Sequence, residues 1–233
     1  YLADQVRSMT RFPHSRIHVI PLGTPLPATG LSRSDARKTY EIPENAMVLG
    51  LLGRMDPLKG QRELLEAFMQ VAPEFQNLHV LMVGEPTLHE GDEYLADLKK
   101  IANQGPYADR IHFGPFTRNT GAFFMSTDVF VMASYAETFG MVTIEAMSYG
   151  LPVIGTKTAG TPDLTEQGRA GALFEPKSSK ALAHTIRKCL NDPQWLERSG
   201  HQSLEIFKSR FEKNATLDAI ERLIRNQGSH DSP

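Results

Sequence analysis

The sequence has little cysteine and no clustered metal ligands. Cys189 is the only cysteine among 233 residues, so no internal disulfide can form. A chain without disulfides is typical of the reducing cytosol, and we expect a cytoplasmic protein. The eight histidines lie far apart, and none joins a Cys, Asp or Glu cluster at metal-ligand spacing. We therefore expect no metal site.

Long apolar runs and an excess of charge are also missing. No stretch reaches the roughly 18 apolar residues that a membrane span needs, and the first residues lack the layout of a signal peptide. With 25 Lys and Arg against 27 Asp and Glu, the net charge is −2. This balance gives no reason to expect nucleic acid or an anionic membrane as a partner, so any anion site must be local.

The sequence does contain short apolar runs that alternate with longer amphipathic segments. The runs predict strands at 16–20, 47–52, 79–83, 110–113, 128–132, 152–155 and 172–174. Helical spacing of apolar residues predicts helices at 2–9, 63–71, 94–101 and 142–148. After Pro176 the pattern is wholly helical, with Ser178 as a cap. The alternation indicates the α/β class, a doubly wound parallel sheet with a C-terminal helical tail.

The loop after the run 47–52 carries two cations between glycines. It reads Gly53-Arg-Met-Asp-Pro-Leu-Lys-Gly60, so Arg54 and Lys59 are five residues apart. Ligands of parallel sheets bind beyond the carboxyl ends of the strands, where these two side chains are able to converge on one anion, such as a diphosphate. The alternative is a pair of solvated surface charges.

The segment after the run 128–132 turns into a helix through Phe139 and Gly140. The amides of Gly140, Met141 and Val142 would meet a phosphate there, together with the positive end of the helix dipole. Glu137 precedes that turn, and Glu145 follows it by about 7.5 Å along the helix axis. A carboxylate accepts two hydrogen bonds, which suits Glu145 to a ribose diol and Glu137 to sugar hydroxyls. The alternatives are a helix-dipole partner for Glu137 and a solvated helix position for Glu145.

Two further loops are candidates for base or sugar contacts. One begins at Gly84, and the other covers 114–118. The backbone of Phe116 and the side chain of Arg118 would meet a nucleobase, although a core Phe and a surface Arg are the simpler interpretation.

Taken in order, these motifs resemble the C-terminal, donor-binding domain of the GT-B glycosyltransferases, and specifically the retaining family 4. The resemblance covers residues 17–190. Its motifs are Val19-Ile-Pro-Leu-Gly23 (with Leu22 in place of the usual Asn), Gly53-Arg-x4-Lys-Gly60, Gly84, Glu137-x-Phe-Gly-x4-Glu145, Gly150-x-Pro-Val153 and Gly160-Thr-Pro-Asp163.

The resemblance implies a Rossmann-like domain that binds a nucleoside-diphosphate sugar, UDP- or GDP-linked, without a metal or other cofactor. Arg54 and Lys59 would hold the diphosphate, Glu137 the transferred sugar and Glu145 the ribose hydroxyls. Gly140 and Met141 would bind phosphate through their amides. Site positions also expected from the motifs are Gly53, Gly84, Phe116, Phe139 and Val142.

The same resemblance implies that the acceptor-binding N-terminal domain is missing, so the isolated fragment is expected to be inactive. Residues 1–18 would be the remnant of that domain or its linker, 19–192 the nucleotide-sugar-binding domain, 193–226 C-terminal helices, and 227–233 a disordered tail. Two alternatives stay open: a stand-alone nucleotide-sugar-binding regulatory module and a sugar-nucleotide epimerase. A nicotinamide-dependent dehydrogenase is disfavoured because no Gly-x-Gly-x-x-Gly follows the first strand.

Overall fold

The centre of the molecule is a parallel sheet. The computed structural model describes residues 2–11, 13–28, 30–87, 90–137 and 139–228. The strands are β1 (Met47–Leu52), β2 (Leu78–Val83), β3 (Ile111–Gly114), β4 (Val129–Met132), β5 (Val153–Thr156) and β6 (Gly171–Phe174). Their order is β3-β2-β1-β4-β5-β6, and every neighbouring pair is parallel. The chain runs outward from β1 and then returns to place β4 beside it, so the switch point of this Rossmann-like sheet lies between β1 and β4.

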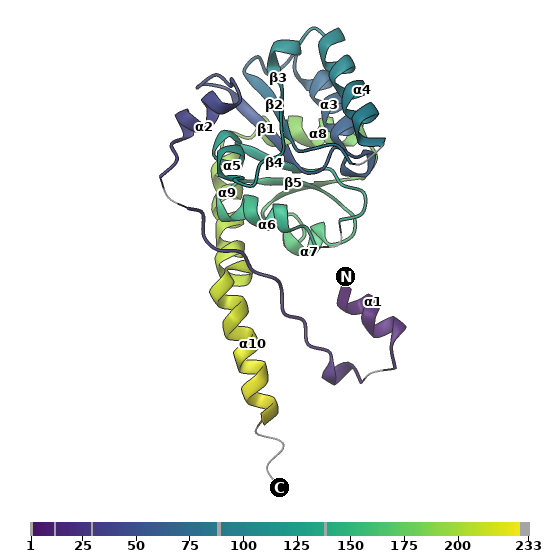
Figure 1. Ribbon diagram of the computed structural model, residues 1–233, viewed down its shortest axis with the longest axis vertical. Helices are drawn as coiled ribbons and strands as arrows, with labels where there is room; N and C mark the ends of the chain where they lie inside the picture. The colour runs from purple at the N-terminus through teal and green to yellow at the C-terminus, as the bar shows by residue number, and fades with distance from the viewer. Residues whose placement is uncertain (1, 12, 29, 88–89, 138, 229–233) are drawn as a thin grey trace.

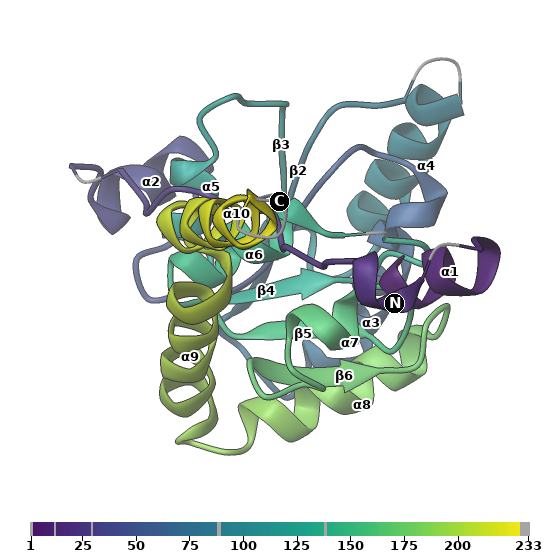
Figure 2. The same ribbon diagram turned by 90° about the horizontal axis from the view of Figure 1, so that it is seen from below.

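Helices cover both faces of the sheet (Figures 1 and 2). They are α1 (Leu2–Met9), α2 (Arg33–Thr39), α3 (Gln61–Val71), α4 (Glu90–Gln104), α5 (Gly121–Ser126), α6 (Met141–Ser148), α7 (Thr161–Leu164), α8 (Ser179–Leu190), α9 (Trp195–Ile206) and α10 (Lys213–Gly228). A π-helical turn, Phe207–Phe211, follows α9. Successive strand residues point to opposite faces, so Leu49 joins the core with α3, α4 and α8, and Val48 joins the core with α5, α6 and α9.

The predicted α/β class, the doubly wound sheet and the helical tail are confirmed, but the predicted strand at 16–20 is wrong. His14–Arg16 is a 3-10 turn, and 17–20 is irregular. Val19 is 62% exposed, and the alternating pattern there has no neighbouring strand to pair with. Helices α2, α5 and α7 were not predicted, because each is short.

Helices α1 and α10 lie away from the sheet (Figure 1). The segment before α2 pairs with the start of α10, since the Thr24 amide donates to the Phe211 carbonyl at 2.9 Å and the Lys213 amide donates to the Thr24 carbonyl at 3.1 Å. Helix α10 extends through Gly228, two residues into the predicted tail, and 229–233 lie outside the described residues. None of the described helices is long and apolar enough to span a membrane.

Candidate functional site at the switch point of the sheet

Contacts with α3 and with the segment after β4 hold the loop after β1 in one shape. The Gln61 side-chain amide donates to the Arg54 carbonyl at 2.7 Å. Gly60 has φ of 76°, and a Cβ there would lie 2.4 Å from the Ala133 carbonyl oxygen, so only glycine fits. The loop that carries Lys59 therefore lies directly against the segment that follows β4.

Lys59 and Glu137 form an ion pair across the switch point. Their side-chain nitrogen and oxygen are 2.7 Å apart, and the side chains are 24% and 22% exposed. The Gly160 amide donates to the Glu137 carbonyl at 3.1 Å and fixes the backbone at this point. The pair is thus partly removed from water yet open on one side. The interpretation of Lys59 as a solvated surface charge is wrong.

A cavity of 220 Å³ lies beside this pair. It is lined by Leu51, Leu52, Gly53, Arg54, Lys59, Val131, Met132, Ala133, Glu137 and Val142. The Arg54 side chain is exposed at this cavity. The structure therefore brings five of the predicted site residues together, and two of them are cations.

Helix α6 begins beside the same cavity. Gly140 has φ of 80°, and a Cβ there would lie 3.3 Å from Glu137 Cγ and 3.0 Å from Leu164 Cδ1. The first bonds back to the Gly140 carbonyl come from the amides of Thr143 and Ile144, at 2.9 and 3.3 Å. The amides of Met141 and Val142 precede these bonds and have no acceptor within the helix. Thr138 lies outside the described residues.

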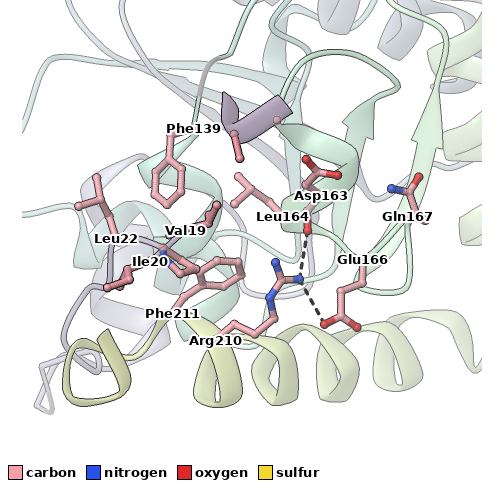
Figure 3. A pocket seen from close by; sticks show the side chains of 13 residues that line it. Val19, Ile20, Leu22, Phe139, Asp163, Leu164, Glu166, Gln167, Arg210 and Phe211 are labelled. Atoms are coloured by element: carbon pink, nitrogen blue, oxygen red, sulfur yellow. Dashed lines mark hydrogen bonds and ion pairs between the residues drawn. The ribbon is translucent and has the colours of Figure 1, made fainter. Parts of the chain in front are cut away.

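Phe139 does not line the cavity beside Arg54 and Lys59. It lines a separate cavity of 570 Å³ with Val19, Leu22, Leu164 and Phe211, and Figure 3 shows its ring among these apolar side chains. Phe139 thus faces the segment that precedes α2 across this cavity.

Glu145 lies deeper along α6 and is half-buried. Burial raises the pKa of its carboxyl group, and the Thr120 hydroxyl opposes this by donating a hydrogen bond at 3.5 Å. The interpretation of Glu145 as a solvated helix position is therefore wrong. Thr120 belongs to the loop after β3, so Glu145 faces that loop. Thr120 could not be singled out beforehand, because a single threonine in a loop has no distinguishing pattern.

Gly84 and Phe116 lie at the neighbouring strand ends. A Cβ at Gly84 would lie 1.9 Å from the Gly53 carbonyl oxygen, and the Gly84 amide donates to Gly114 at 3.2 Å. Gly84 and Phe116 line a third cavity, of 540 Å³, and Phe116 is 54% exposed. The core interpretation of Phe116 is wrong, whereas Arg118 lies on the surface as expected.

Within the described part of the chain, no group of three or more His, Cys, Asp or Glu side chains is arranged to hold a metal ion. The charges at the switch point are instead those of Arg54, Lys59 and Glu137.

The profile of the family described as Glycosyl transferases group 1 matches residues 32–227. The chain belongs to this family. The predicted resemblance to the glycosyltransferases is thereby confirmed.

The curated relatives of this chain are longer than it is. A D-inositol 3-phosphate glycosyltransferase of Streptomyces avermitilis is 34% identical over 180 residues, which cover 75% of this chain and 38% of that protein. Another, of Mycolicibacterium smegmatis, is 28% identical over 236 aligned positions, which cover 99% of this chain and 53% of that protein. The chain spans about half or less of the length of these relatives.

Solved structures share the fold of this chain. The crystal structure of Anabaena Alr3699/HepE in complex with UDP and glucose matches with a TM-score of 0.82 and 25% identity, over 95% of this chain and 60% of that one. The C-terminal domain of the group 1 protein LpcC from Francisella tularensis matches over 99% of its own length, with a TM-score of 0.68 and 22% identity. The sheet and its helices are thus the C-terminal, Rossmann-like half of a GT-B fold.

Proposed function

We propose that this chain is the donor-binding half of an enzyme that transfers a sugar from a nucleoside diphosphate to an acceptor hydroxyl. The observation that carries the proposal is the partly buried Lys59–Glu137 pair, which lies with Arg54 on one cavity at the switch point. Ligands of doubly wound sheets bind at this place. Membership of the group 1 glycosyltransferases supports a nucleotide sugar as that ligand.

The cations would act on the diphosphate. When the bond between sugar and phosphate breaks, negative charge rises on the phosphate oxygen that leaves. Arg54 and Lys59 would stabilise that charge, and the amides of Gly140, Met141 and Val142 would bind the neighbouring phosphate oxygens. Side-chain cations would thus serve in place of a divalent metal.

The two carboxylates would bind the sugar and the ribose of the donor. Glu137, held by Lys59, would accept hydrogen bonds from hydroxyls of the transferred sugar. Glu145 would accept bonds from the ribose diol, at a place between α6 and the loop after β3. The backbone around Gly84 and Phe116 would meet the base.

We also propose a uridine donor and retention of configuration at the transferred sugar. HepE structures that hold UDP and UDP-glucose are 25% and 27% identical to this chain, which supports the choice of base. Retention follows the resemblance to family 4, and the anomer of the product, measured by NMR with the full-length protein, tests it.

The acceptor would bind to a second domain of the full-length protein. On helix α10 the side chains of Leu217, Ile220 and Ile224 are 47%, 39% and 65% exposed. They are spaced three and four residues apart. Such an apolar stripe fits packing against another part of a longer chain. The chain alone would then bind the donor without turnover.

Calorimetry with the full-length protein tests donor binding. UDP-glucose, GDP-mannose and ADP-glucose are titrated separately, and we expect heat from at least one, with UDP-glucose strongest. Arg54→Ala should weaken UDP binding by about tenfold, because a bond to a charged group is lost. Lys38→Ala is the matched control, since Lys38 is an exposed cation on α2. No heat from any of the three, or equal losses in both variants, would sink the proposal.

A further inference from the structure

Tyr135 lies where four loops of the carboxyl edge meet, and the proposed function assigns it no role. It follows β4 by three residues and precedes Glu137 by two. Its amide donates to the Leu58 carbonyl at 2.9 Å. Its carbonyl accepts from the Thr158 hydroxyl at 3.5 Å, and the Lys177 ammonium lies 5.2 Å from the centre of its ring. Thr158 follows β5 and Lys177 follows β6.

The Tyr135 hydroxyl donates a hydrogen bond to the carboxylate of Glu63, in the first turn of α3. The other oxygen of that carboxylate is buried and has no hydrogen-bond partner among the described residues. Burial, and after it the bond to Glu63, raise the pKa of the Tyr135 hydroxyl, so it stays a neutral donor. Loss of the hydroxyl would leave both oxygens of this carboxylate without a partner among the described residues, which is costly.

This bond spans the two segments that carry the ion pair. Lys59 stands between Leu58 and Gly60, and both of those residues contact the segment 133–135. The Ser134 hydroxyl adds a second bond to the Leu58 carbonyl, at 3.2 Å. Because α3 starts directly after Gly60, the Tyr135–Glu63 bond ties the start of α3 to the strand end that leads to Glu137.

We infer that Tyr135 is a positioning residue, which through Glu63 holds the loop of Lys59 and the loop of Glu137 at the separation that the donor sugar requires. The inference rests on the proposed function, because it assigns Glu137 to the sugar. A shift of the Glu137 loop by a fraction of an ångström would weaken contacts with the sugar more than contacts with the diphosphate, because Glu137 is assigned to the sugar and Arg54 and Lys59 to the diphosphate.

The test compares UDP-glucose with UDP in the full-length protein. Tyr135→Phe removes one oxygen and keeps the ring under Lys177. We expect the ratio of the two dissociation constants, UDP-glucose over UDP, to rise about tenfold. Glu63→Leu should raise the ratio equally. Glu63→Gln keeps an acceptor for the Tyr135 hydroxyl and should stay within about twofold of the parent ratio.

The matched control is Tyr94→Phe. Tyr94 is a buried tyrosine whose hydroxyl accepts the Arg62 amide at 3.1 Å, also at the start of α3, but it lies on α4 and makes no link to Glu137. We expect it to lower stability and leave the ratio unchanged. An unchanged ratio in Tyr135→Phe, or an equal rise in Tyr94→Phe, would overturn the inference. If the parent binds neither UDP nor UDP-glucose, the proposed function itself fails.

Discussion

Ion pairs join the neighbourhoods of β1 and β4 at both ends of the strands, and the two ends are built differently. At the amino end Asp128 pairs with Arg33 and, at 2.9 Å, with Arg37, which is 1% exposed. At the carboxyl end Glu137 pairs with Lys59 at 2.7 Å, and both side chains are more than one-fifth exposed.

The partners of the charges also differ. Arg37 donates to the carbonyls of Pro43, Glu44 and Ala46, and Asp128 accepts the Val48 amide at 2.8 Å. The protein thus uses most of the hydrogen-bonding capacity of this pair for itself. The Lys59–Glu137 pair lines a cavity and leaves capacity for a ligand. In this chain the incompletely enclosed Lys59–Glu137 pair lines the cavity at the switch point, whereas Arg37 is enclosed and serves the fold.

The largest expected effect is on stability, when a substitution breaks the Arg37–Asp128 pair at the amino end. Arg37→Ala leaves Asp128 partly buried with fewer partners, so the free energy of unfolding should fall by about 3–5 kcal/mol. Denaturant unfolding monitored by circular dichroism measures this. Lys38→Ala, next to it on the exposed face of α2, should change stability by less than about 0.5 kcal/mol. Equal losses in both variants would show that Arg37 is not the anchor.

The second effect is on UDP binding, when a substitution breaks the Lys59–Glu137 pair at the carboxyl end. Lys59→Ala should weaken UDP binding about 10- to 100-fold, because a charge-assisted bond to phosphate is lost. Its effect on unfolding should stay below about 1 kcal/mol, since the pair is partly solvated. Calorimetry and denaturant unfolding on the same samples separate the two quantities. A large loss of stability with unchanged affinity would reverse the roles assigned to the two pairs.

The third effect is a dependence of stability on pH that arises near the amino end of the sheet. His79 of β2 is 7% exposed, and its ring nitrogen lies 3.0 Å from that of His112 in β3. Burial, followed by the neighbouring His112, lowers the pKa of His79 to about 4. Asp109, Arg110 and Arg37 also act on this ring. The amino-end half of the sheet therefore contains a group that folding keeps neutral.

The sign of the pH effect follows from that lowered pKa. The unfolded chain binds a proton near pH 6.5 and the folded chain only near 4, so stability is complete above about 6.5 and falls as pH drops. Between pH 6.5 and 5 the loss should reach about 2 kcal/mol. His79→Gln should reduce this loss, and His184→Gln, at an exposed position, should not. Parallel curves for parent and His79→Gln would contradict the assignment.

The smallest effect belongs to Glu145. Burial raises the pKa of its carboxyl group, so the carboxylate is lost at a higher pH than is usual for a glutamate. UDP affinity should therefore weaken as pH falls through that raised value, by a few-fold, because a protonated acid is a poorer acceptor for the ribose diol. Calorimetry across pH with Glu145→Gln, whose affinity should not vary in this way, isolates the effect.

Much of the fold and part of the site were predictable from the sequence. Six strands were predictable because buried parallel strands are short apolar runs, whereas 16–20 has such a pattern without a partner strand. The cations at 54 and 59 stand out because glycines bracket them. The approach of Lys59 to Glu137 depends on the contact of Gly60 with Ala133. This contact joins the segments that follow two different strands, so no local sequence pattern reveals it.

Other features of the site depend on tertiary contacts alone. Thr120 and Glu145 are 25 residues apart and meet only because α6 packs beside the loop after β3. Tyr135 and Glu63 are 72 residues apart. The outward position of Phe116 was not predictable either, since an aromatic residue that follows a strand is more often buried.

Hydrogen exchange of the full-length protein with and without saturating UDP tests the central claim most directly. If the carboxyl end is the donor site, exchange should slow in the segments 53–60 and 139–145 and stay unchanged in 37–46, which surrounds Arg37. Slowing in 37–46, or no slowing in 53–60 and 139–145 when UDP is bound, would contradict the assignment of the two ends.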